Sequence, residues 1–147
     1  MPQMDAYLNF NGNCADAMRF YERTLNGKLE MLMTHAESPV AAQTPPGSAD
    51  RIMHARLVID GRSLMASDSM VGQPYTGMHG FAVSLIYPTA AEAQRVFDAL
   101  GKGGKVHMPF QKTFWAEGFG MLVDRFGTPW MVNGAMVKVE AGQRSAA

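Results

Sequence analysis

Two polar side chains, His54 and Arg56, are the first candidates for chemistry in this chain. They alternate with apolar residues over positions 53–59, a pattern that predicts a β-strand with both side chains on its polar face. In that position His54 can act as a general base and Arg56 can hold an anion. A single histidine on a strand is more often a hydrogen-bonded structural residue, and that alternative stays open.

Cys14 is the only cysteine among the 147 residues, so no internal disulfide can form. It falls at the start of a predicted helix, a place that lowers the pKa of a thiol. No histidine or lysine stands at a spacing that would pair with it, so we interpret Cys14 as a packing residue. Asp68 closes a predicted strand ahead of Ser69, and we interpret it as a turn cap.

The stretch from Gln111 to Asn133 is the most distinctive part of the chain, because it contains both tryptophans, three phenylalanines and several glycines. Asp124–Gly127 predicts a turn between two strands, and the second strand starts at Pro129. Ahead of these strands we predict an aromatic and glycine-rich loop from Thr113 to Gly120. That loop forms either the wall of a ligand cleft or a lid over another subunit.

The elements that position these residues follow from periodicity and turn residues. In the first half we predict a strand over 5–10, a helix from an Asn13 cap to Asn26-Gly27, strands over 28–35, 53–59 and 62–68, and a loop over 37–51. In the second half we predict a strand through Phe81, Val83 and Leu85, a capping box of Thr89 and Glu92, and a helix with the buried stripe Ala93, Val96, Phe97 and Leu100.

The second half repeats the first. The two predicted helices align at a constant offset of 76 residues, which places Asp16 on Glu92, Tyr21 on Phe97 and Gly27 on Gly103. Each half has the element order βαβββ, so we predict an α+β fold in one domain over residues 1–136. Unit one spans about 4–70 and unit two about 77–136, and residues 137–147 are predicted as a frayed tail.

The charge balance excludes two classes of partner. Thirteen basic residues balance thirteen acidic residues and form no basic run, so we expect neither nucleic acid nor a membrane surface as a partner. The sequence has no signal-peptide pattern and no apolar run of membrane-spanning length, so we predict a cytoplasmic protein.

The element order and several short motifs resemble a known superfamily. Two βαβββ units in this length resemble the vicinal oxygen chelate superfamily, which includes glyoxalase I, extradiol dioxygenases, fosfomycin-resistance enzymes and bleomycin-binding proteins. More narrowly, the chain resembles the PhnB-like branch in four motifs: Tyr7 to Ala17, Leu64 to Asp68, Gln111 with Phe114-Trp115, and Phe119 to Met131.

This resemblance implies a cupped mixed sheet with helices on its convex side. Its concave face binds a small molecule, usually through a divalent metal that His and Glu residues hold. Members of the branch are often labelled 3-demethylubiquinone methyltransferases. This chain has no glycine-rich strand-to-helix turn followed by a ribose-binding acid, so we do not expect a methyltransferase.

The four metal positions of the superfamily fall on Asp5, Met65, Gly80 and Met131. One carboxylate and two thioethers supply too few oxygen or nitrogen donors for magnesium, manganese, iron or zinc. We therefore predict a site without a metal or other cofactor, in which Met65 and Met131 face each other across the cleft.

Strand alternation places polar side chains beside these two methionines, and aromatic side chains of the 113–120 loop can cover them. The predicted ligand contacts are Tyr7, His54, Arg56, Met65, Ser67, Gln111, Phe114, Trp115, Met131 and Asn133.

Two classes of function follow from this site. The first is a protein that binds a small apolar or aromatic molecule. The alternative is a metal-dependent lyase, isomerase or dioxygenase whose ligands are Asp5, His54 and His79. A module with only a structural role is the third possibility. We also predict a homodimer, in which an apolar aromatic surface such as Phe114, Trp115 and Phe119 covers the sheet edges of a second copy.

Overall fold

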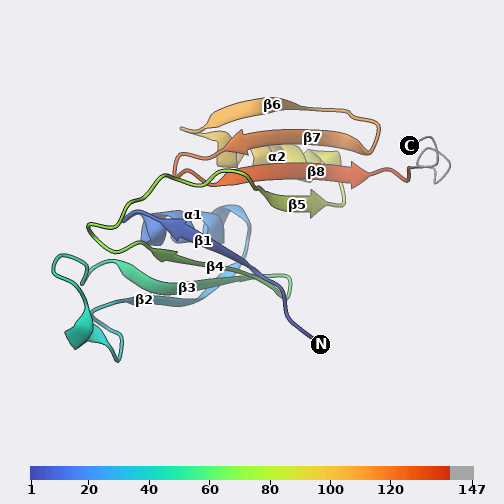
Figure 1. The fold of residues 1–147 in the computed structure, drawn as a ribbon. Helices are drawn as coiled ribbons and strands as arrows, with labels where there is room; N and C mark the ends of the chain where they lie inside the picture. Colours follow the sequence, from blue (N-terminus) through green and yellow to red (C-terminus); the bar gives the residue numbers. More distant parts are fainter. Residues whose placement is uncertain (140–147) are drawn as a thin grey trace. The chain divides into compact units, whose positions relative to one another are not determined.

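The computed structural model describes residues 1–139 and divides the chain into two compact units, one from Met1 to His79 and one that starts at Gly80. In chain order the first unit contains β1 (Ala6–Phe10), α1 (Cys14–Thr24), β2 (Lys28–Thr34), the short 3-10 helix η1 (Ala41–Gln43), β3 (Ile52–Ile59) and β4 (Arg62–Asp68). The second contains β5 (Val83–Tyr87), α2 (Ala90–Gly101), β6 (Lys105–Gln111), β7 (Ala116–Val123) and β8 (Pro129–Met136). Figure 1 shows both units.

Each unit forms one four-stranded mixed sheet. The strand orders are β1-β4-β3-β2 and β5-β8-β7-β6, which is the same topology twice. The β1–β4 and β5–β8 pairs are parallel and the other pairs are antiparallel. The α+β class and the two βαβββ units are therefore confirmed. That the two units form one domain over 1–136 stays a prediction, and residues 140–147 of the predicted tail lie outside the described residues.

The core of the first unit lies between its sheet and α1. Leu8 and Phe10 of β1 are buried, and α1 buries Cys14, Ala17, Met18 and Tyr21. The helix begins after Asn13, where the sequence placed its cap, but the Asn13 side chain makes no capping hydrogen bond. Asp68 takes that role instead, because its Oδ1 accepts hydrogen bonds from the backbone N–H groups of Gly12 and Cys14.

The core of the second unit confirms the predicted stripe, since Ala93, Val96, Phe97 and Leu100 are the buried residues of α2. Thr89 caps this helix by accepting a hydrogen bond from the Glu92 N–H at 3.2 Å, as the capping box predicted. The sheet meets the helix at glycines. A Cβ atom on Gly120 would lie 2.5 Å from the Phe97 ring, and one on Gly134 would lie 2.7 Å from Ala90 Cα.

Two predictions about the second unit were wrong. The residues from Ala116 to Gly120 belong to β7 and do not form a loop, because Gly118 and Gly120 leave room for Phe110 and Phe97 on the helix side of that strand. Glycine in this strand therefore reflects close packing. Phe81 lies ahead of β5, which begins at Val83, and its side chain is exposed.

The long loop before β3 is anchored to its own unit. Arg51 Nη1 donates hydrogen bonds to Asn11 Oδ1 and to the Ser69 carbonyl, both at 2.9 Å, and the Val71 N–H donates to Ser48 Oγ. In the described part of the chain neither helix is long and apolar enough to span a membrane.

Candidate functional site

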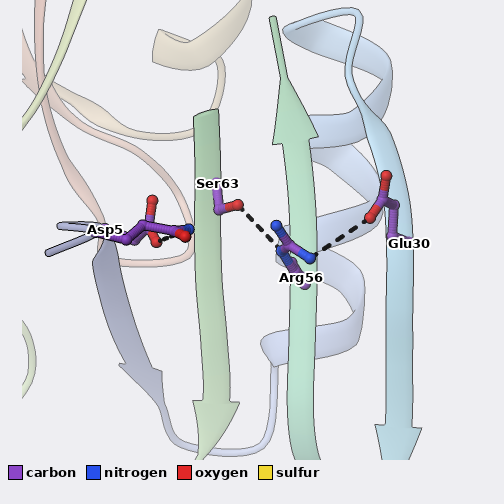
Figure 2. A network of polar contacts seen from close by, with 5 residues as sticks. Asp5, Glu30, Arg56 and Ser63 are labelled. Carbon is purple, nitrogen blue, oxygen red and sulfur yellow. Dashed lines mark hydrogen bonds and ion pairs between the residues drawn. The ribbon is translucent and has the colours of Figure 1, made fainter. Parts of the chain in front are cut away.

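Each sheet has one face covered by its helix and one face that the helix leaves uncovered. In the first unit, Leu64 and Ala66 are buried, whereas Met65 between them is half-buried and points to the other side. We call that side the first open face. It carries Tyr7 and Asn9 of β1, His54 and Arg56 of β3, and Ser63, Met65 and Ser67 of β4. Figure 2 shows Arg56 and Ser63 on the side of the sheet away from α1.

Tyr7 and His54 interact with each other on the first open face, although 47 residues separate them. The Tyr7 hydroxyl lies 3.0 Å from His54 Nδ1, and the two rings stack with centroids 5.8 Å apart and an angle of 27° between their planes. The contact crosses β4, because Tyr7 belongs to β1 and His54 to β3. The prediction that Tyr7 and His54 lie on the same face of the sheet is confirmed. That they bind a ligand stays a prediction.

Arg56 of β3 has one polar partner on each neighbouring strand. Its Nε donates a hydrogen bond to Ser63 Oγ at 3.1 Å, and its Nη1 lies 3.7 Å from Glu30 Oε1 (Figure 2). The side chains of Arg56 and Glu30 are 42% and 44% exposed, so this long ion pair contributes little stability. Glu30 could not be predicted from strand alternation, because it lies at an irregularity of β2.

The second unit has an open face of different chemistry. Gly118, Gly120 and Gly134 approach α2 or Phe110, so the intervening residues of β7 and β8 point to the other side. We call that side the second open face. It carries Ser84 and Ile86 of β5, Phe119 and Met121 of β7, and Met131 and Asn133 of β8.

An aromatic cluster borders the second open face. Trp115 makes edge-to-face contacts with Phe114 and Phe119, at centroid distances of 4.9 Å and 5.0 Å. Its indole Nε1–H donates a hydrogen bond to Asn133 Oδ1 at 3.1 Å. Gln111 is exposed and lies in register with Phe119. The structure thus brings together Phe114, Trp115 and Asn133 of the predicted ligand contacts. It also places Phe119 among them, so the prediction that Phe119 belongs to an exposed dimer surface was wrong, because Phe119 is only 3% exposed.

The hydrogen bond from Trp115 fixes the orientation of the Asn133 side chain. An indole N–H can only donate, so the atom that faces it is the amide oxygen. The amide nitrogen of Asn133 then points elsewhere, and it makes no hydrogen bond to any of residues 1–139. Asn133 is only 5% exposed. The second open face therefore presents a recessed hydrogen-bond donor surrounded by aromatic and thioether side chains.

Met65 and Met131 occupy equivalent places in the two units. In the parallel pair β1–β4, Tyr7 is in register with Met65, and in β5–β8, Ser84 is in register with Met131. Both methionines are half-buried and lie on the open faces. That they face each other across a cleft stays a prediction, because they belong to different units.

The three residues predicted as ligands in the metal-dependent alternative do not lie close together. No group of three or more His, Cys, Asp or Glu side chains within residues 1–139 could hold a metal ion, so Asp5, His54 and His79 do not converge. His79 lies outside the strands and Asp5 Oδ2 accepts a hydrogen bond from Gln3 Nε2. The four positions that the superfamily uses carry one carboxylate, two thioethers and a glycine, a donor set that does not fit a hard divalent ion.

Cys14 and Asp68 both serve the structure. The interpretation of Cys14 as a packing residue is confirmed, because the side chain is buried; burial raises the pKa of its thiol, and the nearby negative charge of Asp68 raises it further. The Asp68 carboxylate accepts hydrogen bonds from three backbone N–H groups, those of Gly12, Cys14 and Ile52. Neither group is available as a nucleophile or base.

Comparisons with known proteins agree with this fold. Residues 2–133 match the family described as 3-demethylubiquinone-9 3-methyltransferase. The chain belongs to that family. It is 39% identical to protein YjdN of Escherichia coli (strain K12) over 138 residues, which cover 88% of this chain and 93% of YjdN.

Solved structures share this fold, in agreement with the resemblance to the PhnB-like branch of the vicinal oxygen chelate superfamily. Protein PA1353 from Pseudomonas aeruginosa is 47% identical, with a TM-score of 0.84 over 90% of this chain and 97% of PA1353. The PhnB protein from Bacillus cereus is 24% identical, with a TM-score of 0.76 over 90% of this chain and 98% of that one. The fosfomycin resistance protein FosX from Listeria monocytogenes shares the fold alone, at 7% identity and a TM-score of 0.60 over 91% of this chain and 94% of FosX.

Proposed function

We propose that this PhnB-like protein binds a small apolar or aromatic molecule that carries an acceptor oxygen, and that it does so without a metal. The observation that carries the proposal is the Asn133 amide, whose oxygen is occupied by Trp115 while its nitrogen is left as a donor. A donor recessed among apolar side chains selects a ligand with a carbonyl, ether or hydroxyl oxygen, because an apolar ligand without one would leave the donor unpaired.

The side chains around Asn133 suit the body of such a ligand. Phe119 is in register with Asn133, and Met121 is in register with Met131, so an aromatic and two thioether side chains adjoin the donor. Methionine adapts its shape and makes favourable contacts with aromatic rings. The exposed Phe114 ring can fold over a bound molecule, because its side chain is 74% exposed.

The start of α1 is already occupied by a carboxylate of the chain itself. The family name refers to methyl transfer, but the turn from β1 to α1 is Asn11-Gly12-Asn13, and its Gly12 and Cys14 N–H groups already bind the Asp68 carboxylate. A helix N-terminus that is occupied in this way offers no place for a nucleotide-like cofactor. The donor set at the superfamily's metal positions argues in the same direction against the metal-dependent lyase, isomerase or dioxygenase.

A titration with acetophenone, a neutral aromatic ketone, tests the proposal. We expect saturable binding that shifts the indole N–H resonance of Trp115, and we expect Asn133→Leu to weaken binding about tenfold, since it removes the donor at similar volume. Gln94→Ala, at an exposed position of α2, is the matched control and should bind as the parent does. Stoichiometric zinc, nickel, manganese or iron in the purified protein would contradict the proposal and favour the metal-dependent alternative.

We further propose a cytoplasmic homodimer. The apolar side chains exposed on the second unit support the dimer, above all Phe114, and the outer strands β2 and β6 leave sheet edges that a second copy can cover. Light scattering at micromolar concentration should give twice the mass of one chain. A monomer mass would remove this part of the proposal and leave the ligand site untouched.

A further inference from the structure

Arg56 is the one arginine of the first open face, and its guanidinium is only partly engaged. Ser63 accepts a hydrogen bond from Nε, and Glu30 lies 3.7 Å from Nη1. Nη2 makes no hydrogen bond to any of residues 1–139. A planar guanidinium with a free N–H edge is the group that proteins use to bind carboxylates in a paired arrangement.

The neighbours of Arg56 decide what kind of anion fits. On one side Arg56 is in register with Met65 of β4, and on the other with Met31 of β2, whose side chain is 42% exposed. Met65 is in turn in register with Tyr7, which is 51% exposed. The positive charge therefore stands between two thioethers, with an aromatic ring on β1, two strands away. This surface suits an anion with an aromatic body, because thioethers and aromatic rings attract each other.

The Tyr7–His54 pair adds a second polar group at a defined distance. His54 and Arg56 are two residues apart on one strand, so they stand about 6.6 Å apart along the face. The Tyr7 hydroxyl engages Nδ1, which leaves Nε2 of His54 directed away from that contact. Nε2 makes no hydrogen bond within the described part of the chain, so it can bind a polar substituent of the same ligand.

We propose that the first open face is a binding site for an aromatic carboxylate, with the carboxylate on Arg56 and the ring over Met65 and Tyr7. All residues of this site belong to the first unit, whereas the neutral ligand is proposed for Asn133 of the second unit. Glu30 competes with the ligand for Arg56. Because the Arg56–Glu30 pair is long and half exposed, a ligand that makes two parallel hydrogen bonds can displace it.

Calorimetric titration with benzoate tests the site. The parent protein should bind benzoate and should bind benzamide, its uncharged counterpart, about tenfold more weakly, as expected for loss of a charge-assisted hydrogen bond. Acetate and inorganic phosphate should also bind more weakly, because neither has a ring to contact the methionines. Equal binding of all four compounds would overturn the proposal.

Variants with opposite expected effects complete the test. Arg56→Gln should weaken benzoate binding about tenfold, whereas Glu30→Gln should strengthen it about two- to fivefold by removing the competing carboxylate. A gain of affinity cannot arise from misfolding. Arg62→Gln, at an exposed position of β4, removes the same charge outside the site and should change affinity by less than about twofold. The proposal fails if Arg56→Gln binds benzoate as the parent does, or if Arg62→Gln loses as much affinity as Arg56→Gln.

Discussion

The two open faces of this duplicated protein can be compared residue by residue, because the two sheets share one register. The parallel pair β1–β4 runs from Ala6–Leu64 to Phe10–Asp68, and the pair β5–β8 runs from Val83–Trp130 to Tyr87–Gly134. Equivalent positions on the open faces are Tyr7 and Ser84, Met65 and Met131, Ser67 and Asn133, Arg56 and Met121, and His54 and Phe119. Only the methionine pair is the same in both units.

The helix-covered faces differ much less from one another. Leu64 and Ala66 of β4 correspond to Trp130 and Val132 of β8, and all four are buried. Burial against a helix restricts a position to apolar residues of suitable volume, whereas an open face has no such restriction. The two units thus keep the same kind of core and present two different chemistries, one with an arginine and a histidine and one with aromatic rings and an amide.

The ends of the two parallel pairs also differ. Asp68 stands where the second unit has Gly134, and its carboxylate binds the first N–H groups of α1. At Gly134 the absence of a side chain lets α2 approach the strand, and Thr89 caps that helix from within its own segment. One unit therefore fixes its helix by a buried carboxylate, and the other fixes it by close backbone contact.

The largest expected effect comes from removing a buried carboxylate. Asp124 accepts hydrogen bonds from the N–H groups of Phe126 and Thr128 and from Trp130 Nε1, at 2.9, 3.1 and 2.8 Å. Asp124→Ala should lower the free energy of unfolding by about 3–5 kcal/mol, because it leaves two buried donors and one part-buried donor without that acceptor. Asp68→Ala should cost a similar amount, and the exposed Asp98→Ala should cost almost nothing.

Amide hydrogen exchange sharpens this first comparison. Asp68→Ala should lose protection first in residues of the first unit, and Asp124→Ala should lose it first in the second. A cost below about 1 kcal/mol for Asp124→Ala in urea unfolding would show that the carboxylate is not the anchor.

The next effect concerns the close contact in the second unit. Gly134→Ala should destabilise the protein by about 1–3 kcal/mol, because its Cβ would lie 2.7 Å from atoms of Ala90 and Ala93. Gly101→Ala is the matched control: its Cβ would meet its nearest atom at 3.7 Å, an ordinary contact, so the change should be neutral or slightly stabilising. If Gly134→Ala unfolds at the same urea concentration as the parent, α2 does not pack as closely as described.

The smallest effect is a pH dependence of the first unit. The pKa of Cys14 is raised in the folded state from its ordinary 9.0, so the unfolded thiol ionises first as pH rises. The contribution of the protonated Cys14 thiol to the free energy of unfolding is thus fully present below pH 9.0. Above pH 9.0 it falls by about 1.4 kcal/mol per pH unit. Burial also raises the pKa of Tyr75 and Tyr87, which adds to the loss in the same direction. Cys14→Ala should show a shallower decline between pH 8 and pH 10, and an unchanged slope would contradict the assignment to Cys14.

Sequence reasoning predicted the elements that local patterns determine. The α2 stripe, the capping box at Thr89 and the turn at Gly127 follow from residues close together in the chain, and the structure has each of them. The duplication also placed Met65 and Met131 at equivalent positions, because two copies of one pattern must share one register.

The remaining features depend on partners far apart in the sequence. Asp68 caps α1 from 54 residues away. Its neighbours in the sequence indicated only a local turn, because they do not show such a distant partner. The contact between Tyr7 and His54 depends on the order of β1, β4 and β3, which no local pattern shows. The glycines of β7 indicated a loop because their physical reason, the approach of Phe97 and Phe110, is tertiary.

The central claim is that the two open faces take different ligands, and a single ¹H–¹⁵N correlation experiment tests it. The side-chain N–H signals of Trp115 Nε1 and Arg56 Nε report on one face each. Acetophenone should shift the Trp115 signal and leave that of Arg56 in place, and benzoate should do the reverse. If both compounds shift the same signal, or if neither shifts any, the account of two chemically distinct faces is wrong.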